Sequence, residues 1–107
     1  MLIDGTDELA EIFALLGDPG RMRMLLRLAS GSAPVGELAT TAGLSASAAS
    51  HALRLLRAHR IVRATRHGRE MHYELADAHV AELLAVGQTH LEHARPDHSD
   101  DSPAPTR

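Results

Sequence analysis

The stretch ELATTAGLSASAASHALRLLRAHRIV, residues 37–62, decides how this chain folds. A short helix is expected in its first part, with Leu38 and Ala39 facing inward, and Gly43 follows where a glycine typically ends a helix. Ser45 stands where a serine caps the next helix. The apolar positions of that next helix recur on one face: Ala49, Ala52, Leu53 and Leu56. Two helices joined by a glycine turn indicate a helix–turn–helix unit, whose second helix enters the major groove of DNA.

Helical periodicity predicts further helices before this unit. Residues 7–16 have apolar positions at helical spacing and stop at a glycine. Asp18 and Pro19 then supply an N-cap and a first-position proline for a helix that runs to about residue 29. The first helix of the helix–turn–helix unit is expected over about residues 35–42.

Downstream of the unit, residues 61–75 alternate loosely in polarity around His67-Gly68, which predicts a β-hairpin with its tight turn there. A last helix is expected from about residue 77 to 94. The order of elements predicts a mainly α fold with a small β-hairpin, a winged helix–turn–helix. We assign residues 1–94 to this domain and expect the polar, proline-rich tail, 95–107, to be disordered.

Composition excludes several classes of protein. The chain has 107 residues, 44% of them hydrophobic, which suits one domain with a modest core. It has no cysteine, so disulfides and thiolate metal sites are excluded. No apolar run has the roughly 18 residues of a membrane span, and the acidic start does not resemble a signal peptide. We therefore expect a soluble, cytoplasmic protein that does not bind membranes.

Charge is distributed unevenly, and the middle of the chain is basic. The net charge is −3, yet residues 19–75 carry nine arginines against three glutamates. Serine hydroxyls and basic side chains on the second helix and the hairpin can reach the phosphates and base edges of DNA. The candidate DNA contacts are Ser45, Ser47, Ser50, His51, Arg54, Arg57, Arg66 and Arg69.

Two pairs of metal-ligand side chains lie at opposite ends of the last helix. Asp77 and His79 are at its start, and His90 and His93 are near its end. A rise of about 1.5 Å per residue puts His79 and His90 about 16 Å apart, too far to share one ion. An antiparallel second copy of the helix would bring the first pair of one subunit beside the second pair of the other. Two-fold symmetry then gives two equivalent sites in a dimer.

Several stretches resemble the ArsR/SmtB family of bacterial metal-sensing repressors, over about residues 7–94. They are GDPGRMRMLLRL, ELATTAGLSASAASHALRLLRAHRIV, the RHGREMHYEL hairpin, and the Asp-x-His and His-x-x-His pairs of the last helix. The resemblance implies a homodimer, formed through the N- and C-terminal helices, that binds operator DNA when metal-free and more weakly with metal. It also implies one ion per subunit at the dimer interface, held by Asp77, His79, His90 and His93.

The resemblance leaves the metal open. Pro34 and Gly36 stand where arsenic, lead and cadmium sensors have a Cys-x-Cys pair, so that site is absent. Four nitrogen and oxygen ligands suit Zn(II). Nickel or cobalt sensors of the family use about six ligands, with extra donors from a tail, and His98 is a candidate here. The ligand pattern favours Ni(II) or Co(II) slightly over Zn(II).

Other functions remain as alternatives. A winged-helix regulator that ignores metal would answer to another ligand or a partner protein, and a co-regulator protein is kept as a further partner. An enzyme is not expected, because residues 90–93, HLEH, differ from the zinc-protease HExxH pattern and no nucleophile–base set or phosphate loop is present.

Overall fold

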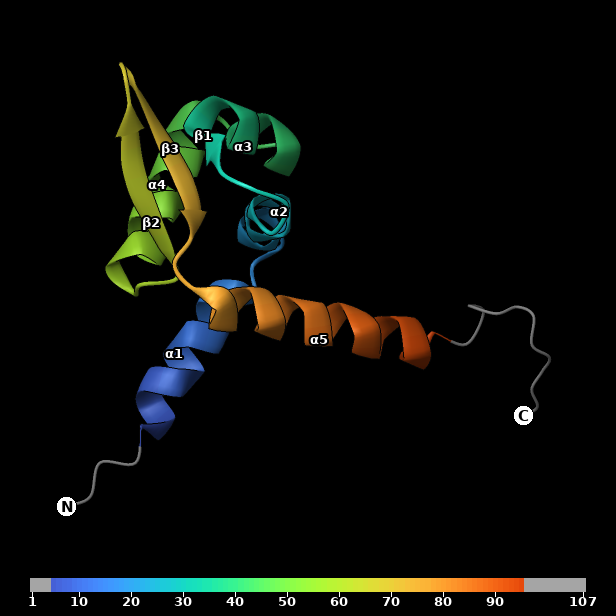
Figure 1. Ribbon diagram of the computed structural model, residues 1–107. Coiled ribbons are helices and arrows are strands. Elements are labelled where there is room, and N and C mark those ends of the chain that lie inside the picture. Colours follow the sequence, from blue (N-terminus) through green and yellow to red (C-terminus); the bar gives the residue numbers. More distant parts are fainter. Residues whose placement is uncertain (1–4, 96–107) are drawn as a thin grey trace. The chain divides into compact units, whose positions relative to one another are not determined.

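The computed structural model describes residues 5–95, which form two compact units that divide after Asp77 (Figure 1). The first unit contains α1 (Thr6–Leu16), α2 (Pro19–Leu28), β1 (Ala33–Pro34), α3 (Val35–Ala42), α4 (Ala46–Ala58), β2 (Val62–His67) and β3 (Glu70–Leu75). The second contains α5 (Ala78–Ala94). The mainly α, winged helix–turn–helix fold is confirmed. The expected disordered tail lies, from residue 96 on, outside the described residues.

The sheet of the first unit has three antiparallel strands in the order β1-β3-β2. The sequence predicted only the hairpin and missed β1, in which Ala33 pairs with Tyr73 and Pro34 with His72. A two-residue strand is too short to show alternation, and proline weakens a strand prediction although it is tolerated at a sheet edge.

The hairpin turn lies one residue later than predicted. His67 belongs to β2 and pairs with Glu70, so Gly68 and Arg69 form the turn. Gly68 has a φ of 64° and Arg69 is not among the residues with positive φ. A positive φ at the first turn residue alone is typical of a type II′ hairpin turn with glycine there.

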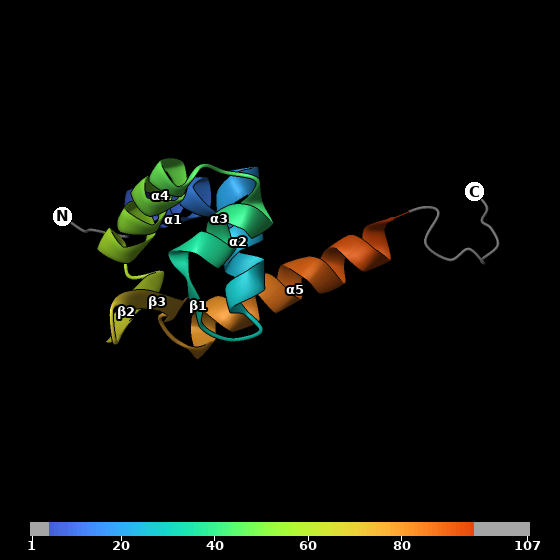
Figure 2. The same ribbon diagram turned by 90° about the horizontal axis from the view of Figure 1, so that it is seen from above.

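The core of the first unit forms where α2, α3 and α4 meet each other and the sheet, as Figure 2 shows from above. Its largest fully buried side chains are Met24, Leu25, Leu38, Leu53, Leu56 and Val62. The predicted inner residues of α3 and α4 are all buried. Packing of these faces fixes the angle between the two helices, and so the position of α4.

Local signals set the ends of these helices as predicted. The Ser45 hydroxyl accepts a hydrogen bond from the Ala48 amide at 3.0 Å, and the Asp18 carboxylate accepts one from the Arg21 amide at 3.0 Å. Gly43 ends α3 in the left-handed region, with a φ of 71°. Arg60 follows α4 with a φ of 61°, a conformation that costs a residue other than glycine about 1–2 kcal/mol.

The second unit consists of one long helix with little burial. Leu84 is its buried residue, whereas Leu83, Val86 and Leu91 are exposed. Among the described residues, no helix combines the length and the apolar character that crossing a membrane requires.

Candidate DNA-binding surface and metal-ligand pairs

The outer face of α4 carries the polar residues predicted to contact DNA. Ser45, Ser47, His51 and Arg54 are exposed, and Ser50 is half-buried beside the core face. The Ser45 hydroxyl is already used as the helix cap, so it has one donor left for a ligand. The start of α4 therefore presents short side chains, which allow a close approach, with a guanidinium two turns later.

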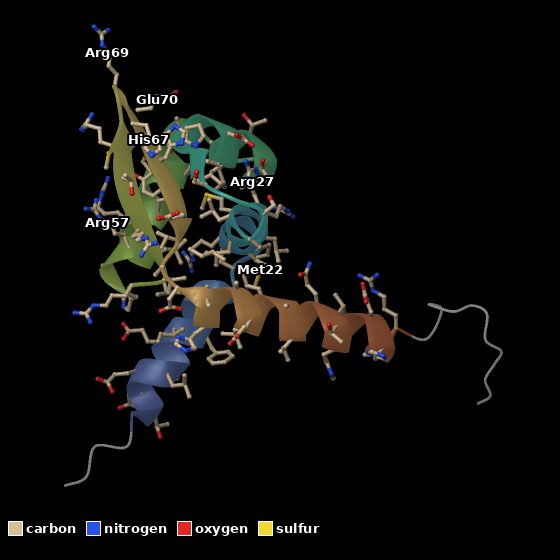
Figure 3. The ribbon with its side chains drawn as sticks, in the orientation of Figure 1. Met22, Arg27, Arg57, His67, Arg69 and Glu70 are labelled. Atoms are coloured by element: carbon tan, nitrogen blue, oxygen red, sulfur yellow. The ribbon has the colours of Figure 1, made fainter. Side chains whose placement is uncertain are left out.

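Six arginines recur every third residue from Arg54 to Arg69, and they differ in what holds them. The Arg63 guanidinium is bound at the base of the wing, which is the β2–β3 hairpin. It donates to the Glu74 carboxylate at 2.7 Å and to the Ala76 carbonyl at 3.3 Å. Within residues 5–95, no such bond holds Arg54, Arg57, Arg66 or Arg69. Figure 3 shows Arg69 at the tip of the hairpin, pointing away from it. These four side chains are available for an anionic partner such as DNA phosphate.

The wing also carries a histidine pair that the sequence reasoning missed. The rings of His67 and His72 stack with centroids 4.4 Å apart and an interplanar angle of 18°. His72 Nε2 lies 3.2 Å from a carboxylate oxygen of Glu70, which Figure 3 shows near the hairpin tip with His67. The β-hairpin register that brings them together was predictable only after the turn was placed at Gly68 and Arg69.

A second missed residue joins α4 to α1. His59 Nδ1 donates to the Leu55 carbonyl at 3.0 Å, and its Nε2 lies 3.4 Å from the Glu11 carboxylate. The Leu55 carbonyl, and then Glu11, raise the pKa of His59 above 6.5, while partial burial opposes them. Protonated His59 also lies at the C-terminal end of α4, where the negative end of the helix dipole favours a positive charge.

The four predicted metal ligands lie at the two ends of α5. Asp77 directly precedes the helix and His79 is its second residue, whereas His90 and His93 are in its last turns. All four are exposed. In the part of the chain that the structure describes, no three histidine, aspartate or glutamate side chains gather closely enough to hold a metal ion. His98, the predicted extra ligand, lies outside the described residues.

The His93 ring is oriented by a backbone hydrogen bond. Its Nδ1 lies 2.9 Å from the Thr89 carbonyl oxygen, which can only accept, so Nδ1 carries the proton. The Nε2 lone pair is therefore the one that a metal would meet. His90 lines a shallow hollow on the same helix with Ala85, Val86 and Thr89. His90 and His93 are thus both exposed at the surface of α5.

Comparison with known proteins gives the same assignment for the DNA-binding unit. Residues 18–64 match the family described as "Bacterial regulatory protein, arsR family". The chain is 41% identical over 92 residues to the "Transcriptional repressor SmtB homolog" of Synechocystis sp., covering 86% of this chain and 70% of the relative. It is 39% identical over 97 residues to the "HTH-type transcriptional regulator NmtR" of Mycobacterium tuberculosis, covering 91% and 81%.

A solved structure agrees in fold. The homodimeric winged helix-turn-helix DNA-binding domain of Mb0332 from Mycobacterium bovis superposes with a TM-score of 0.76 at 31% identity, covering 88% of this chain and 94% of that one. The family and these relatives are described as regulators of transcription. The fold contains α4 as the reader helix, the helix expected to enter the major groove, and the β2–β3 hairpin as the wing. Together with this fold, the similarities show that the chain belongs to the ArsR family of bacterial regulatory proteins and is a DNA-binding regulator of transcription.

Proposed function

We propose that this chain is a homodimeric, metal-responsive repressor that acts in the cytoplasm. The metal-free dimer binds operator DNA, and a divalent ion, Ni(II) or Co(II) or else Zn(II), weakens that binding. The observation that carries the proposal is the division of four exposed ligands between the two ends of α5. Ligand pairs about 16 Å apart on one helix cannot share an ion, but two antiparallel helices can bring them together.

The donor set fits a borderline metal ion. Three imidazoles and one carboxylate suit zinc, cobalt or nickel, and the chain has no cysteine for softer ions. The His93 hydrogen bond to Thr89 fixes its ring in the tautomer that offers Nε2. Ni(II) or Co(II) would draw further ligands from outside these four, with His98 as the candidate; Zn(II) would be satisfied by four.

Four observations support a homodimer in which α5 meets a second copy. Leu83, Val86 and Leu91 are large apolar side chains that a single chain leaves exposed, with Val86 exposed by 66%. A Cβ placed on Gly87 meets nothing within 4 Å, so the helix surface is open to close approach there. On α1, Leu9 and Phe13 are also exposed, by 56% and 51%. The similar Mb0332 domain is homodimeric.

In the proposed mechanism the metal-binding helix and the reader helix respond to the same change in the dimer. The bound ion supplies a cross-link between the two chains through its ligands. Such a cross-link affects DNA binding only if the arrangement it favours differs from the one that places both α4 helices in successive major grooves. His90 is the residue proposed to pass the change inward, through its second ring nitrogen. The coupling is reciprocal, so operator DNA should weaken metal binding equally.

Calorimetric titration of the metal-free protein with Ni(II) and with Zn(II) tests this proposal. The wild type should bind about one ion per chain, and an Asp77→Ala/His79→Ala variant should lose that binding. His67→Ala, which removes a wing histidine, is the control and should bind as the wild type does. Absence of saturable binding by the wild type would reject the metal-responsive function and favour a regulator that answers to another ligand.

A further inference from the structure

The base of the wing carries a basic hollow, which shares Arg57 with the candidate DNA contacts and Asp77 with the predicted metal ligands but includes Arg60 and Arg63, which belong to neither set. It measures about 400 Å³ and is lined by Arg57, Arg60, Val62, Arg63, Ala64, Ala76 and Asp77. This volume lies within the roughly 300–1,000 Å³ that is usual for small-molecule sites. Three guanidinium groups against one carboxylate make its lining favourable to an anion.

The three arginines reach the hollow from different backbone segments. Arg57 belongs to the last turn of α4, Arg60 to the turn after it, and Arg63 to β2. The bonds of Arg63 to Glu74 and Ala76 hold its guanidinium in place but use only two of its five N–H donors. The side chains of Arg57 and Arg60 make no hydrogen bond or ion pair within residues 5–95, so both guanidinium groups are available.

Arg60 occupies a backbone position that favours glycine. The Ile61 amide donates to the Leu56 carbonyl at 2.9 Å and the Arg60 amide to that of Arg57 at 3.0 Å, which is the pattern of a Schellman motif. The residue in this position normally is glycine, yet here an arginine adopts a φ of 61°. A function for the Arg60 side chain would explain why a disfavoured residue occupies this position.

The hollow lies away from the surface expected to read DNA. Along α4, Arg57 is twelve residues after Ser45, a rise of about 18 Å. Along β2, Arg63 is at the opposite end from the Gly68 turn, about 16 Å away. Operator contacts at the start of α4 and at the wing tip therefore leave Arg60 and Arg63 free for a small ligand, whereas a DNA contact from Arg57 would compete with that ligand.

We infer that this hollow binds a small phosphate-bearing anion, in addition to the DNA and metal sites proposed above. Guanidinium groups match the geometry of phosphate oxygens, and three of them around one hollow can bind two or more of those oxygens at once. The hollow shares Asp77 with the metal proposal and uses none of its imidazole ligands, and the test variant Arg60→Gly leaves all four proposed metal ligands in place.

Titration of the metal-free, full-length protein with inorganic phosphate tests the inference, with chloride at equal ionic strength as the reference. The wild type should show saturable binding of one phosphate per chain, followed by amide chemical shifts of residues 57–64. Arg60→Gly should bind phosphate at least about tenfold more weakly, since a charge-assisted hydrogen bond is lost. Because glycine suits this φ, the variant should keep or exceed the wild-type thermal stability, which separates lost binding from lost folding.

Arg95→Gln, which removes an arginine from the end of the chain's other unit, is the control and should bind phosphate as the wild type does. An equal response in all three proteins, or one that never saturates, would overturn the inference, because it would show general ionic association only. If Arg60→Gly instead weakens operator binding in phosphate-free buffer, and lowers its salt dependence by about one phosphate contact, the hollow belongs to the DNA interface and the inference is wrong.

Discussion

Helices α4 and α5 both carry proposed ligand contacts, yet they differ in what holds them. α4 has 13 residues and buries Ala49, Ala52, Leu53 and Leu56 in the core of its own chain. α5 has 17 residues and buries Leu84, while Leu83, Val86 and Leu91 stay exposed. The reader helix is therefore positioned by its own chain. The metal-ligand helix has an apolar surface that a single chain does not cover.

This difference shows that apolar residues in the two helices serve different purposes. The apolar face of α4 matches contacts within the chain, so its burial determines the fold. In the proposed dimer, the exposed apolar residues of α5 and the ligand pairs at its two ends would serve contacts with a second chain instead. Substitutions in the two helices should consequently affect different measurements, and the following four predictions test that separation.

The largest effect is expected from the core of α4. Leu53 is fully buried, so Leu53→Ala should lower the free energy of unfolding by about 2–5 kcal/mol through lost burial and the cavity left behind. Leu91→Ala on α5, where the side chain is 50% exposed, should change chain stability by less than about 0.5 kcal/mol. Urea denaturation of both variants measures this, and equal losses would contradict the comparison.

The next effect concerns metal rather than folding. Loss of a residue that supports a metal ligand weakens metal binding by about 10–100-fold, and His90→Ala, which removes a proposed ligand itself, should weaken it at least as much. The variant should also no longer release DNA when metal is added. Operator affinity of the metal-free protein should not change, because α4 is positioned without His90. Fluorescence anisotropy with labelled operator measures both, with Gln88→Ala as the neighbouring control. Lost operator binding in the metal-free His90 variant would reject this separation of roles.

A smaller effect is expected at the start of α4. Ser45→Ala removes the hydroxyl that accepts from the Ala48 amide, and should cost about 1 kcal/mol of stability. Ser47→Ala, two residues further on in the first turn of α4 and not at the cap, should cost less than about 0.5 kcal/mol. Thermal unfolding of the two variants distinguishes them. If both lose the same stability, the cap does not contribute.

The smallest effect links α4 to α1 through protonation. Because the folded-state pKa of His59 is raised above about 6.5, its stabilisation is fully present below that pH and is lost as the pH rises through the raised value. Glu11→Gln should reduce this pH dependence without removing it, since the Leu55 carbonyl contributes more. Melting temperatures of wild type and variant between pH 5.5 and 8.5 measure the difference, and identical profiles would exclude the Glu11 contact.

Much of the fold could be predicted because its signals are local. Gly43, Ser45 and the spacing from Ala49 to Leu56 define the helix–turn–helix unit within about twenty residues, and the structure confirms each of them. β1 was missed because its pairing with β3 joins residues about forty positions apart and leaves no local pattern. The hairpin turn was misplaced by one residue because either His67-Gly68 or Gly68-Arg69 satisfies a glycine turn signal.

The candidate sites also differ in whether the sequence shows them as a local pattern. The four α5 ligands are visible in the sequence as spaced pairs, and they remain a prediction. The hollow at the base of the wing was not predicted, because Arg57 was assigned to DNA contacts and Arg60 and Arg63 were counted only as part of the basic middle of the chain. The signal that could have separated them is the apolar Ile61 directly after Arg60, which is typical of a Schellman ending.

The position of the ligands at both ends of α5 has a consequence for genetics. In the proposed dimer, each ion takes Asp77 and His79 from one chain and His90 and His93 from the other. A chain that lacks the first pair and a chain that lacks the second would each be unresponsive alone. Expressed together, they would form mixed dimers with one intact site, made from the undamaged pair of each. Two defective alleles should then complement one another in a cell that carries both.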